Sequence, residues 1–191
     1  MDSLTQQLDD LRATLDSFRH QLPAVEATGK VLAAALAAGG RILTCGNGGS
    51  ACDALHLTEE LVGRFDRDRR SLAAICLNAD APLLTCIAND FGFDAIFARQ
   101  IEGLGRAGDV LIVFSTSGNS ANLVSALHAA KKNGLATISL LGKSGGRCRG
   151  LAGHDIIVPN ATTARIQEVH TFILHAWLGL IESELGLGHP G

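Results

Sequence analysis

The chain has 191 residues, a formal net charge of −3 at pH 7, and a composition that is 47% hydrophobic and 18% charged. This length suits one well-formed core rather than two full domains, and so apolar a composition excludes a disordered chain. The slightly acidic balance excludes the general electrostatic footprint of a nucleic-acid-binding protein. The start lacks a signal-peptide pattern, and no apolar run is long enough to span a bilayer. We therefore expect a cytoplasmic protein without membrane or nucleic-acid partners.

The first 40 residues are expected to be helical. An apolar stripe recurs at steps of three and four residues, formed by Leu4, Leu8, Leu11, Leu15, Phe18 and Leu22. Pro23 interrupts it, and an Ala/Leu-rich helix continues over 25–38 until Gly39 and Gly40 end it. Because nothing in the chain is an obvious partner for this segment, we expect residues 1–40 to be an oligomerisation segment that packs on a neighbouring chain.

From residue 41 short β-type runs alternate with helical ones. Strands are predicted at 41–45, 71–77, 110–115, 136–141 and 155–158, helices at 50–63, 120–132 and 163–185, two short helical pieces within 82–104, and a turn near Leu151. Residues 41–191 should therefore form one α/β unit. We expect a flavodoxin-like three-layer α/β/α sandwich with a five-stranded parallel sheet and ligands at the carboxyl ends of the strands. The last helix is apolar on most sides, so we expect it to be buried in a subunit interface.

The cysteines are odd in number, and none forms a CxxC pair. They are Cys45, Cys52, Cys76, Cys86 and Cys148, mostly in apolar segments. This usage is typical of buried, reduced thiols in a cytosolic protein.

A single basic cluster stands out, in which arginines are interleaved with aspartates. It consists of Arg64, Arg67, Arg69 and Arg70 around Asp66 and Asp68. The pattern predicts a solvated, salt-bridged loop, and Arg64 is the member most suited to a further role.

The first predicted strand runs into a glycine-rich loop, Cys45-Gly-Asn-Gly-Gly-Ser50, that leads directly into a helix. Its glycines permit a sharp turn and a close backbone approach, and the helix N-terminus behind them favours an anion. With Ala51, the loop also fits the GxGxxA form of the dinucleotide fingerprint. Against this alternative, the second strand ends at Asn78 without an acidic residue at its tip, although Asp80 is close.

A second loop, Ser115-Thr-Ser-Gly-Asn-Ser120, follows the strand at 110–115 and again opens a helix. Four hydroxyls around one glycine form a compact anion cradle, whereas an ordinary serine N-cap requires only one of them. A dinucleotide enzyme does not need this second cradle, but a sugar phosphate does. The two loops together therefore favour phosphate binding.

Polar residues on two helices point to acid–base or metal chemistry. His56 and Glu60 are four residues apart on one helix face, which suits a divalent metal but is also common in surface pairs. Gln167, His170 and His175 interrupt the apolar last helix, where a lone histidine would usually be a satisfied core residue. Gln167 and His175 lie about 12 Å apart along that helix. A single ion could contact both side chains only if it lay between them or if another subunit contributed. We therefore expect the site at a subunit interface.

The two loops resemble the SIS, or sugar isomerase, domain, and the resemblance covers essentially the whole chain. Three further segments are similar to the phosphoheptose isomerases: HLTEELVGR at 56–64, ANDFGF at 88–93, and RIQEVH at 165–170, with His175 following. Several relatives carry an acidic residue just before the last of these segments, where this chain has Ala164.

This resemblance implies a homotetrameric aldose–ketose isomerase. It would interconvert D-sedoheptulose 7-phosphate and D-glycero-D-manno-heptose 7-phosphate through an enediol, for heptose and lipopolysaccharide precursor synthesis. Glu60 would be the base at carbon and His175 the partner acid/base. One zinc per subunit is implied, with ligands His56, Glu60, Gln167 and His175. The expected substrate contacts are Asn47, Gly48, Gly49, Ser50, Glu60, Arg64, Asn89, Asp90, Ser115, Thr116, Ser117, Ser120 and Gln167.

Two other classes of function stay open. Some SIS modules are non-catalytic binding proteins of the replication-initiator-associating type and lack the acid–base pair, whereas this chain has Glu60 and His175. A dinucleotide-binding protein is disfavoured because the chain has no room for a separate substrate domain.

Overall fold

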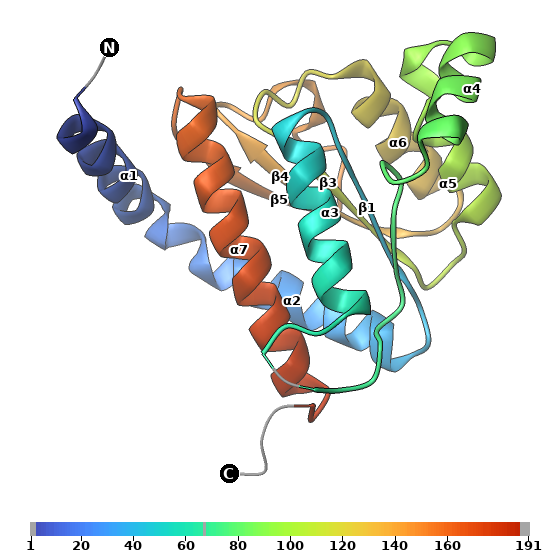
Figure 1. Cartoon of the computed structure of the whole chain (residues 1–191), viewed down its shortest axis with the longest axis horizontal. Coiled ribbons are helices and arrows are strands. Elements are labelled where there is room, and N and C mark those ends of the chain that lie inside the picture. Colours follow the sequence, from blue (N-terminus) through green and yellow to red (C-terminus); the bar gives the residue numbers. More distant parts are fainter. Residues whose placement is uncertain (1–2, 67, 188–191) are drawn as a thin grey trace.

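The computed structural model describes residues 3–66 and 68–187, which form a central sheet with helices on both faces (Figure 1). Five parallel strands lie in the order β2-β1-β3-β4-β5. Their bounds are β1 Ile42–Gly46, β2 Ala74–Cys76, β3 Val110–Ser115, β4 Ala136–Gly142 and β5 His154–Val158. The predicted three-layer α/β/α sandwich is confirmed.

Each face of the sheet is covered by its own layer of helices. One layer contains α2 (Leu22–Ala37), α3 (Gly49–Val62) and α7 (Thr163–Glu184), and the other contains α4 (Ala81–Phe91), α5 (Ala98–Leu104) and α6 (Ala121–Lys132). Alternate residues of each strand serve the two layers: Ile112 and Phe114 pack with the first, and Leu111 and Val113 with the second. Because both faces are covered, β3 is a continuous apolar run rather than an alternating one.

The expectation that the N-terminal segment lacks a partner in its own chain is wrong for α2. Val25, Leu32 and Leu36 are buried in the core beneath α7, and the Trp177 indole donates to the Val25 carbonyl at 3.0 Å. A Cβ at Gly29 would lie 2.8 Å from the Leu180 side chain, so this glycine allows the two helices to pack closely. Within the described chain, α2, α3 and the sheet bury most of the apolar surface of α7 that we had assigned to a subunit interface.

Helix α1 (Leu4–Phe18) differs from α2 because it projects from the body of the molecule (Figure 1). A short 3₁₀ turn, Arg19–Gln21, joins the two helices, and Pro23 lies in the first turn of α2, where proline is tolerated. The predicted leucine stripe of α1 stays on the surface: Leu4 is 83% exposed and Leu8 58%.

The remaining elements follow the predictions with small shifts in their bounds, except that β2 is clearly shorter than predicted. The two helical pieces within 82–104 are α4 and α5, joined by a 3₁₀ turn at Phe93–Ala95, and the turn near Leu151 is a 3₁₀ turn at Gly146–Cys148. All five cysteines are free; Cys45, Cys76 and Cys148 are buried, whereas Cys52 and Cys86 are exposed. None of the described helices has both the length and the apolarity needed to cross a membrane.

The basic cluster is not uniformly solvated, so that prediction is wrong for Arg69. Arg64 and Arg70 are exposed, but the Arg69 side chain is only 2% exposed, because it turns inward to pair with Glu182 of α7. Arg67 lies outside the described residues.

Candidate active site

The two loops singled out in the sequence meet at one edge of the sheet. Strands β1 and β3 are neighbours, with Gly46 opposite Phe114, so the loops that follow them emerge side by side. Between them lies a small cavity of about 80 Å³, lined by Asn47, Ser50, Phe114, Ser115, Thr116, Ser117, Ser120 and Leu123. This edge is the crevice at the carboxyl ends of the strands, where open α/β sheets bind ligands.

Two helices begin beside this cavity without a side-chain cap. The N-cap residue of α3 is Gly48, which has no side chain, and that of α6 is Ser120, whose side chain makes no capping hydrogen bond. The first N–H groups of a helix have no partner within the helix, and they favour an anion. The alternative that Ser120 is an ordinary cap is therefore not supported.

Hydrogen bonds within the second loop leave its hydroxyl protons available. The Ser115 Oγ accepts from the N–H of Gly118 at 2.9 Å, and the Ser117 Oγ accepts from the N–H of Asn119 at 3.2 Å. Since each hydroxyl also has one O–H donor, both serines can still donate to an anion in the cavity. Gly118 has a φ of +65°, and a Cβ there would overlap the Gly145 carbonyl, which fixes the loop against the turn after β4.

The tip of β2 does not provide a ribose-binding carboxylate. The Asn78 side chain bonds both backbone groups of Gly46, accepting from its N–H at 3.1 Å and donating to its carbonyl at 2.9 Å. Asp80 caps α4 by accepting from the N–H of Leu83 at 2.9 Å. Asn78 and Asp80, the two residues on which the dinucleotide-binding alternative depended, therefore already have hydrogen-bond partners within the fold.

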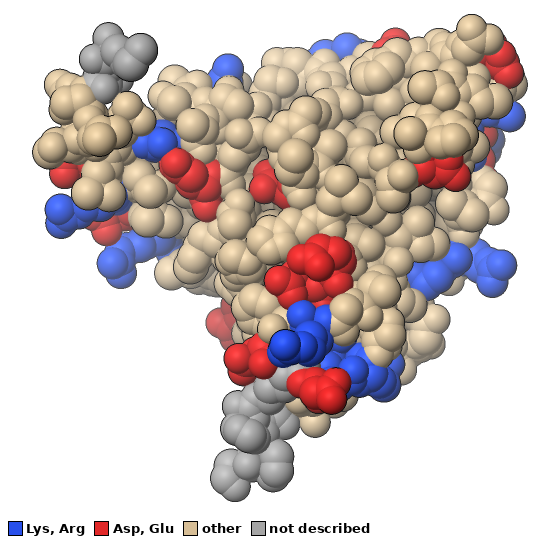
Figure 2. All heavy atoms as spheres, in the orientation of Figure 1, with Lys and Arg blue, Asp and Glu red and all other residues tan. Residues whose placement is uncertain are grey.

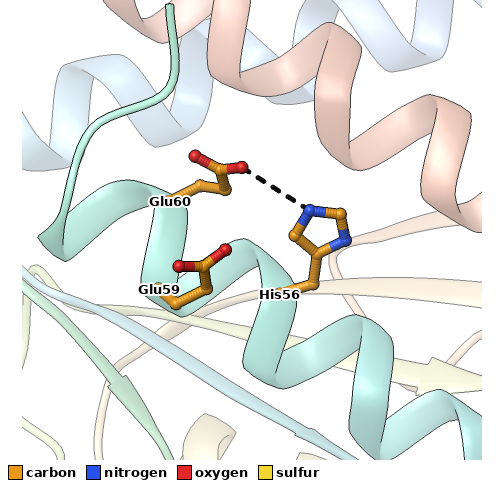
Figure 3. Close-up of side chains that lie close together, drawn as sticks. All are labelled: His56, Glu59 and Glu60. Atoms are coloured by element: carbon orange, nitrogen blue, oxygen red, sulfur yellow. Dashed lines mark ion pairs between the residues drawn. The ribbon is translucent and has the colours of Figure 1, made fainter.

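The acid–base candidates come together between α3 and α7. The Nε2 of His56 lies 3.6 Å from the Glu60 carboxylate and 3.4 Å from the Nε2 of His175. Figure 3 shows His56, Glu59 and Glu60 rising from the same side of α3, and ligand atoms of these three lie within 4.8 Å of one another. Glu59 is a further carboxylate that sequence reasoning missed, although its place beside Glu60 was the available signal.

The spacing of these side chains fits a metal ion. Zinc holds nitrogen ligands at about 2.0–2.1 Å, so two ligands of a tetrahedral zinc lie about 3.3–3.4 Å apart. The two imidazole nitrogens at 3.4 Å match that separation, and two imidazoles with a carboxylate are a donor set that suits zinc.

Neighbouring residues hold the side chains of His56, Glu60 and His175 in place and leave them partly exposed to solvent. The ring of Phe65, just after α3, stacks on His175 with ring centres 5.7 Å apart. The Glu60 side chain is 20% exposed and that of His56 34%. Figure 2 shows acidic side chains gathered over the C-terminal half of α3, the part that carries Glu59 and Glu60. Phe65 had no recognisable signal in the sequence.

Gln167 lies apart from these three side chains, at the start of α3. Its amide covers Gly49 so closely that a Cβ there would overlap it. One turn further along α7, the Thr171 hydroxyl bonds the Asp53 carboxylate at 3.2 Å and the Gln167 carbonyl at 3.1 Å. Burial raises the pKa of Asp53 to about 6, although the Thr171 hydrogen bond and the nearby His56 act in the opposite direction. Three of the four expected metal ligands are therefore close together, and the fourth lies towards the anion cavity.

Three other expected contacts do not line the cavity between the two loops. Asn89 and Asp90 are exposed at the end of α4, in the layer on the opposite face of the sheet from α3 and α7, and the Asn89 amide donates to Asp90 at 2.8 Å. Arg64 is exposed beyond the end of α3. These three residues remain predicted contacts. Ala88, next to Asn89 on α4, lines a second hollow of about 420 Å³ together with Gly46, Asn47 and Gly48, so this end of α4 lies beside the glycine loop of its own chain.

His170 is a core residue, the ordinary alternative that the sequence left open. It is fully buried, its Nε2 lies 3.3 Å from the Leu141 carbonyl, and its ring meets Phe114 edge to face. Burial lowers its pKa to about 4, so the ring is neutral near pH 7.

The comparisons with known proteins agree with this fold. The fold and its two anion-type loops define a sugar-isomerase-type α/β protein, and the SIS domain family matches residues 6–142. The phosphoheptose isomerase of Vibrio vulnificus is 46% identical over 185 residues, 96% of each chain. Solved phosphoheptose isomerases from Neisseria gonorrhoeae and Francisella tularensis superpose with TM-scores of 0.86 and 0.88, at 37% and 33% identity. They cover 94% and 96% of this chain, and 97% and 100% of their own. The chain belongs to the phosphoheptose isomerases of the SIS domain family.

Proposed function

We propose that this chain interconverts D-sedoheptulose 7-phosphate and D-glycero-D-manno-heptose 7-phosphate through an enediol. The observation that carries this proposal is that Glu60 and His175 both lie beside His56, at 3.6 Å and 3.4 Å from its Nε2, and that α3, which carries Glu60, begins at the anion cavity. The phosphoheptose isomerase relatives support the same substrate class.

The cavity between the two loops would anchor the phosphate. Ser115, Ser117 and Ser120 offer hydroxyl donors, and the N-termini of α3 and α6 offer backbone N–H groups. His56 lies seven residues along α3 from Gly49, about 10.5 Å of helix rise. That separation is comparable to the length of an extended seven-carbon sugar phosphate, so C1 and C2 would reach Glu60 when the phosphate is in the cavity.

Isomerisation moves one proton between C1 and C2 and another between the two oxygens. Glu60, a carboxylate held near two imidazoles, would remove the proton from one carbon and return it to the other. His175, kept in orientation by the Phe65 ring, would exchange the oxygen-bound proton. Both groups are only partly exposed, which limits competition from bulk water during the transfer.

Zinc fits the site through His56, Glu60 and His175, and Gln167 completes the expected ligand set with one ion per subunit. Bound zinc would polarise the oxygens at C1 and C2 and so acidify the neighbouring C–H bond. Because Gln167 covers Gly49 at the cavity, its amide would also contact the substrate between the phosphate and the metal.

We further propose that the working form is a homotetramer. The leucine stripe of α1 is exposed, and together with Phe172 of α7, which is 44% exposed, it leaves an apolar surface for a second copy. A role in heptose and lipopolysaccharide precursor synthesis in the cytoplasm would follow from the substrate.

The remaining alternative is a non-catalytic SIS module that binds a protein partner. The proximity of Glu60 and His175 favours the enzyme, since a binding module has no need of that pair. Incubating the purified protein with sedoheptulose 7-phosphate, with and without zinc, and following the aldose signals by NMR distinguishes the two. Appearance of the aldose supports the proposal, and its absence under both conditions refutes it.

A further inference from the structure

Arg69 makes an unusual number of contacts for a residue in a surface loop. It follows α3, yet its guanidinium turns inward and donates to the carbonyl of Glu60 at 2.7 Å and to that of Leu61 at 2.9 Å. Its Nε donates to the Glu182 carboxylate at 2.8 Å, and the two side chains are only 2% and 5% exposed.

These contacts complete the C-terminal end of α3. The last carbonyls of a helix have no partner within the helix, and a cation placed there also offsets the negative end of the helix dipole. Helix α3 ends at Val62, so Glu60 belongs to the last turn, the part most prone to fraying. Arg69 supplies a donor to the Glu60 carbonyl and a second donor to the Leu61 carbonyl, which also accepts from the N–H of Leu72 at 3.0 Å.

The same guanidinium connects α3 to α7. Glu182 lies seven residues after His175 on α7, about 10.5 Å further along the helix. Arg69 thus bonds the turn that carries Glu60 and, through Glu182, the helix that carries His175.

We propose that Arg69, with Glu182 as its counterion, is a positioning residue for the acid–base site. It holds the last turn of α3 and α7 in fixed register, so that Glu60 and His175 both lie beside His56. This inference rests on the proposed isomerase activity for its kinetic consequences, but its structural part stands independently of any substrate.

A purely structural ion pair would behave differently. Loss of such a pair lowers the melting temperature and leaves the kinetics of the folded protein unchanged. Loss of a positioning residue lowers kcat while KM changes little, because the phosphate loops lie at the opposite end of α3.

The test uses the full chain with Arg69→Lys, which keeps the charge but cannot span two carbonyls and a carboxylate. A double variant, Arg69→Met with Glu182→Leu, removes both buried charges together and so leaves neither one unpaired. The matched control is Arg41→Lys, which alters another arginine–carboxylate pair (Arg41–Asp109, 2.7 Å) at the N-terminal edge of the sheet.

In both Arg69 variants we expect kcat to fall by about 10- to 100-fold with KM within about twofold, and zinc affinity measured by calorimetry to fall by about tenfold. Amide hydrogen exchange at residues 60–63 should accelerate, whereas exchange at residues 50–56 should not. Arg41→Lys should match the wild type in all three. Wild-type kcat, zinc affinity and exchange in Arg69→Lys would overturn the inference. An inactive wild type would refute the proposed function, and the exchange measurement would still decide the role of Arg69.

Discussion

Asn47 and Asn122 exchange two hydrogen bonds: the Asn47 amide donates to the Asn122 Oδ1 at 3.0 Å, and the Asn122 amide donates to the Asn47 Oδ1 at 2.9 Å. Asn47 lies in the glycine loop and lines the anion cavity, and Asn122 is buried in the first turn of α6. The pair therefore ties together the two loops that follow β1 and β3, so that they form one site.

Asn122→Ala should raise KM for the heptose phosphate by about tenfold with little change in kcat. The reason is that Asn47 loses both partners and the glycine loop is released, at a cost of about 1–3 kcal/mol. Steady-state kinetics and the affinity for inorganic phosphate measure this. Asn133→Ala is the matched control, because the Asn133 amide also donates a hydrogen bond, here to the Ile101 carbonyl at 3.0 Å, but lies at the far end of α6. A fall in kcat at unchanged KM would contradict the role given to this pair.

Ser117→Ala should weaken phosphate binding without unfolding the protein. The Ser117 hydroxyl accepts only one local N–H bond, whose loss costs about 1 kcal/mol, but it is also a donor to the bound anion. We expect KM to rise roughly tenfold and to recover in Ser117→Thr. Ser17→Ala on α1 removes a comparable hydroxyl (2.9 Å to the Thr14 carbonyl) far from the cavity and should leave KM unchanged. Unaltered affinity for the phosphorylated sugar in Ser117→Ala would exclude the phosphate role.

Replacing the α1 stripe should disrupt assembly while each chain stays folded. Leu8→Glu with Leu15→Glu places charges on the exposed apolar face of α1, so light scattering after gel filtration should report a mass below that of the wild type, which we propose to be a tetramer. Ala13→Glu, about half a turn away on the same helix, is the control and should keep the wild-type mass. A wild-type protein that is monomeric would refute the assembly. Deletion of residues 1–36 would not test the assembly alone, because α2 belongs to the core.

His170 should make stability depend on pH. In the unfolded chain a histidine takes up a proton near pH 6.5, whereas burial lowers the pKa of His170 to about 4 in the folded state. Between these values the unfolded state binds more protons, so stability is complete above pH 6.5 and falls as the pH drops towards 4, by about 2–3 kcal/mol.

Asp53 acts in the opposite direction, because its raised pKa of about 6 favours the folded state on acidification. The informative quantity is therefore the difference between the wild type and His170→Gln, measured in melting temperatures from pH 7.5 to 4.5 without metal. The variant should lose less stability than the wild type as the pH falls. Parallel curves for the two proteins would show that His170 is not responsible.

Much of the fold could be predicted from the sequence, because a parallel sheet with helices on both faces has strands that are continuous apolar runs. The two loops that follow β1 and β3 could also be recognised, because glycines and hydroxyl residues directly after an apolar strand are typical of anion binding. The burial of α2 could not be predicted, because an Ala/Leu-rich pattern does not indicate which surface the helix packs against. Arg69 was missed because its counterion, Glu182, lies 113 residues away, and only tertiary structure brings them together.

The most direct test of the account is hydrogen exchange at the reacting carbons, since it reports proton transfer by Glu60 and His175 themselves. Sedoheptulose 7-phosphate is incubated in D₂O with wild type, Glu60→Gln or His175→Gln, and deuterium at C1 and C2 is followed by NMR. The account predicts rapid exchange with the wild type and exchange about 10²- to 10⁴-fold slower with each variant, although both variants stay folded and assembled. Exchange at the wild-type rate in both variants would contradict the assignment, and no exchange with the wild type, with or without zinc, would favour the binding module.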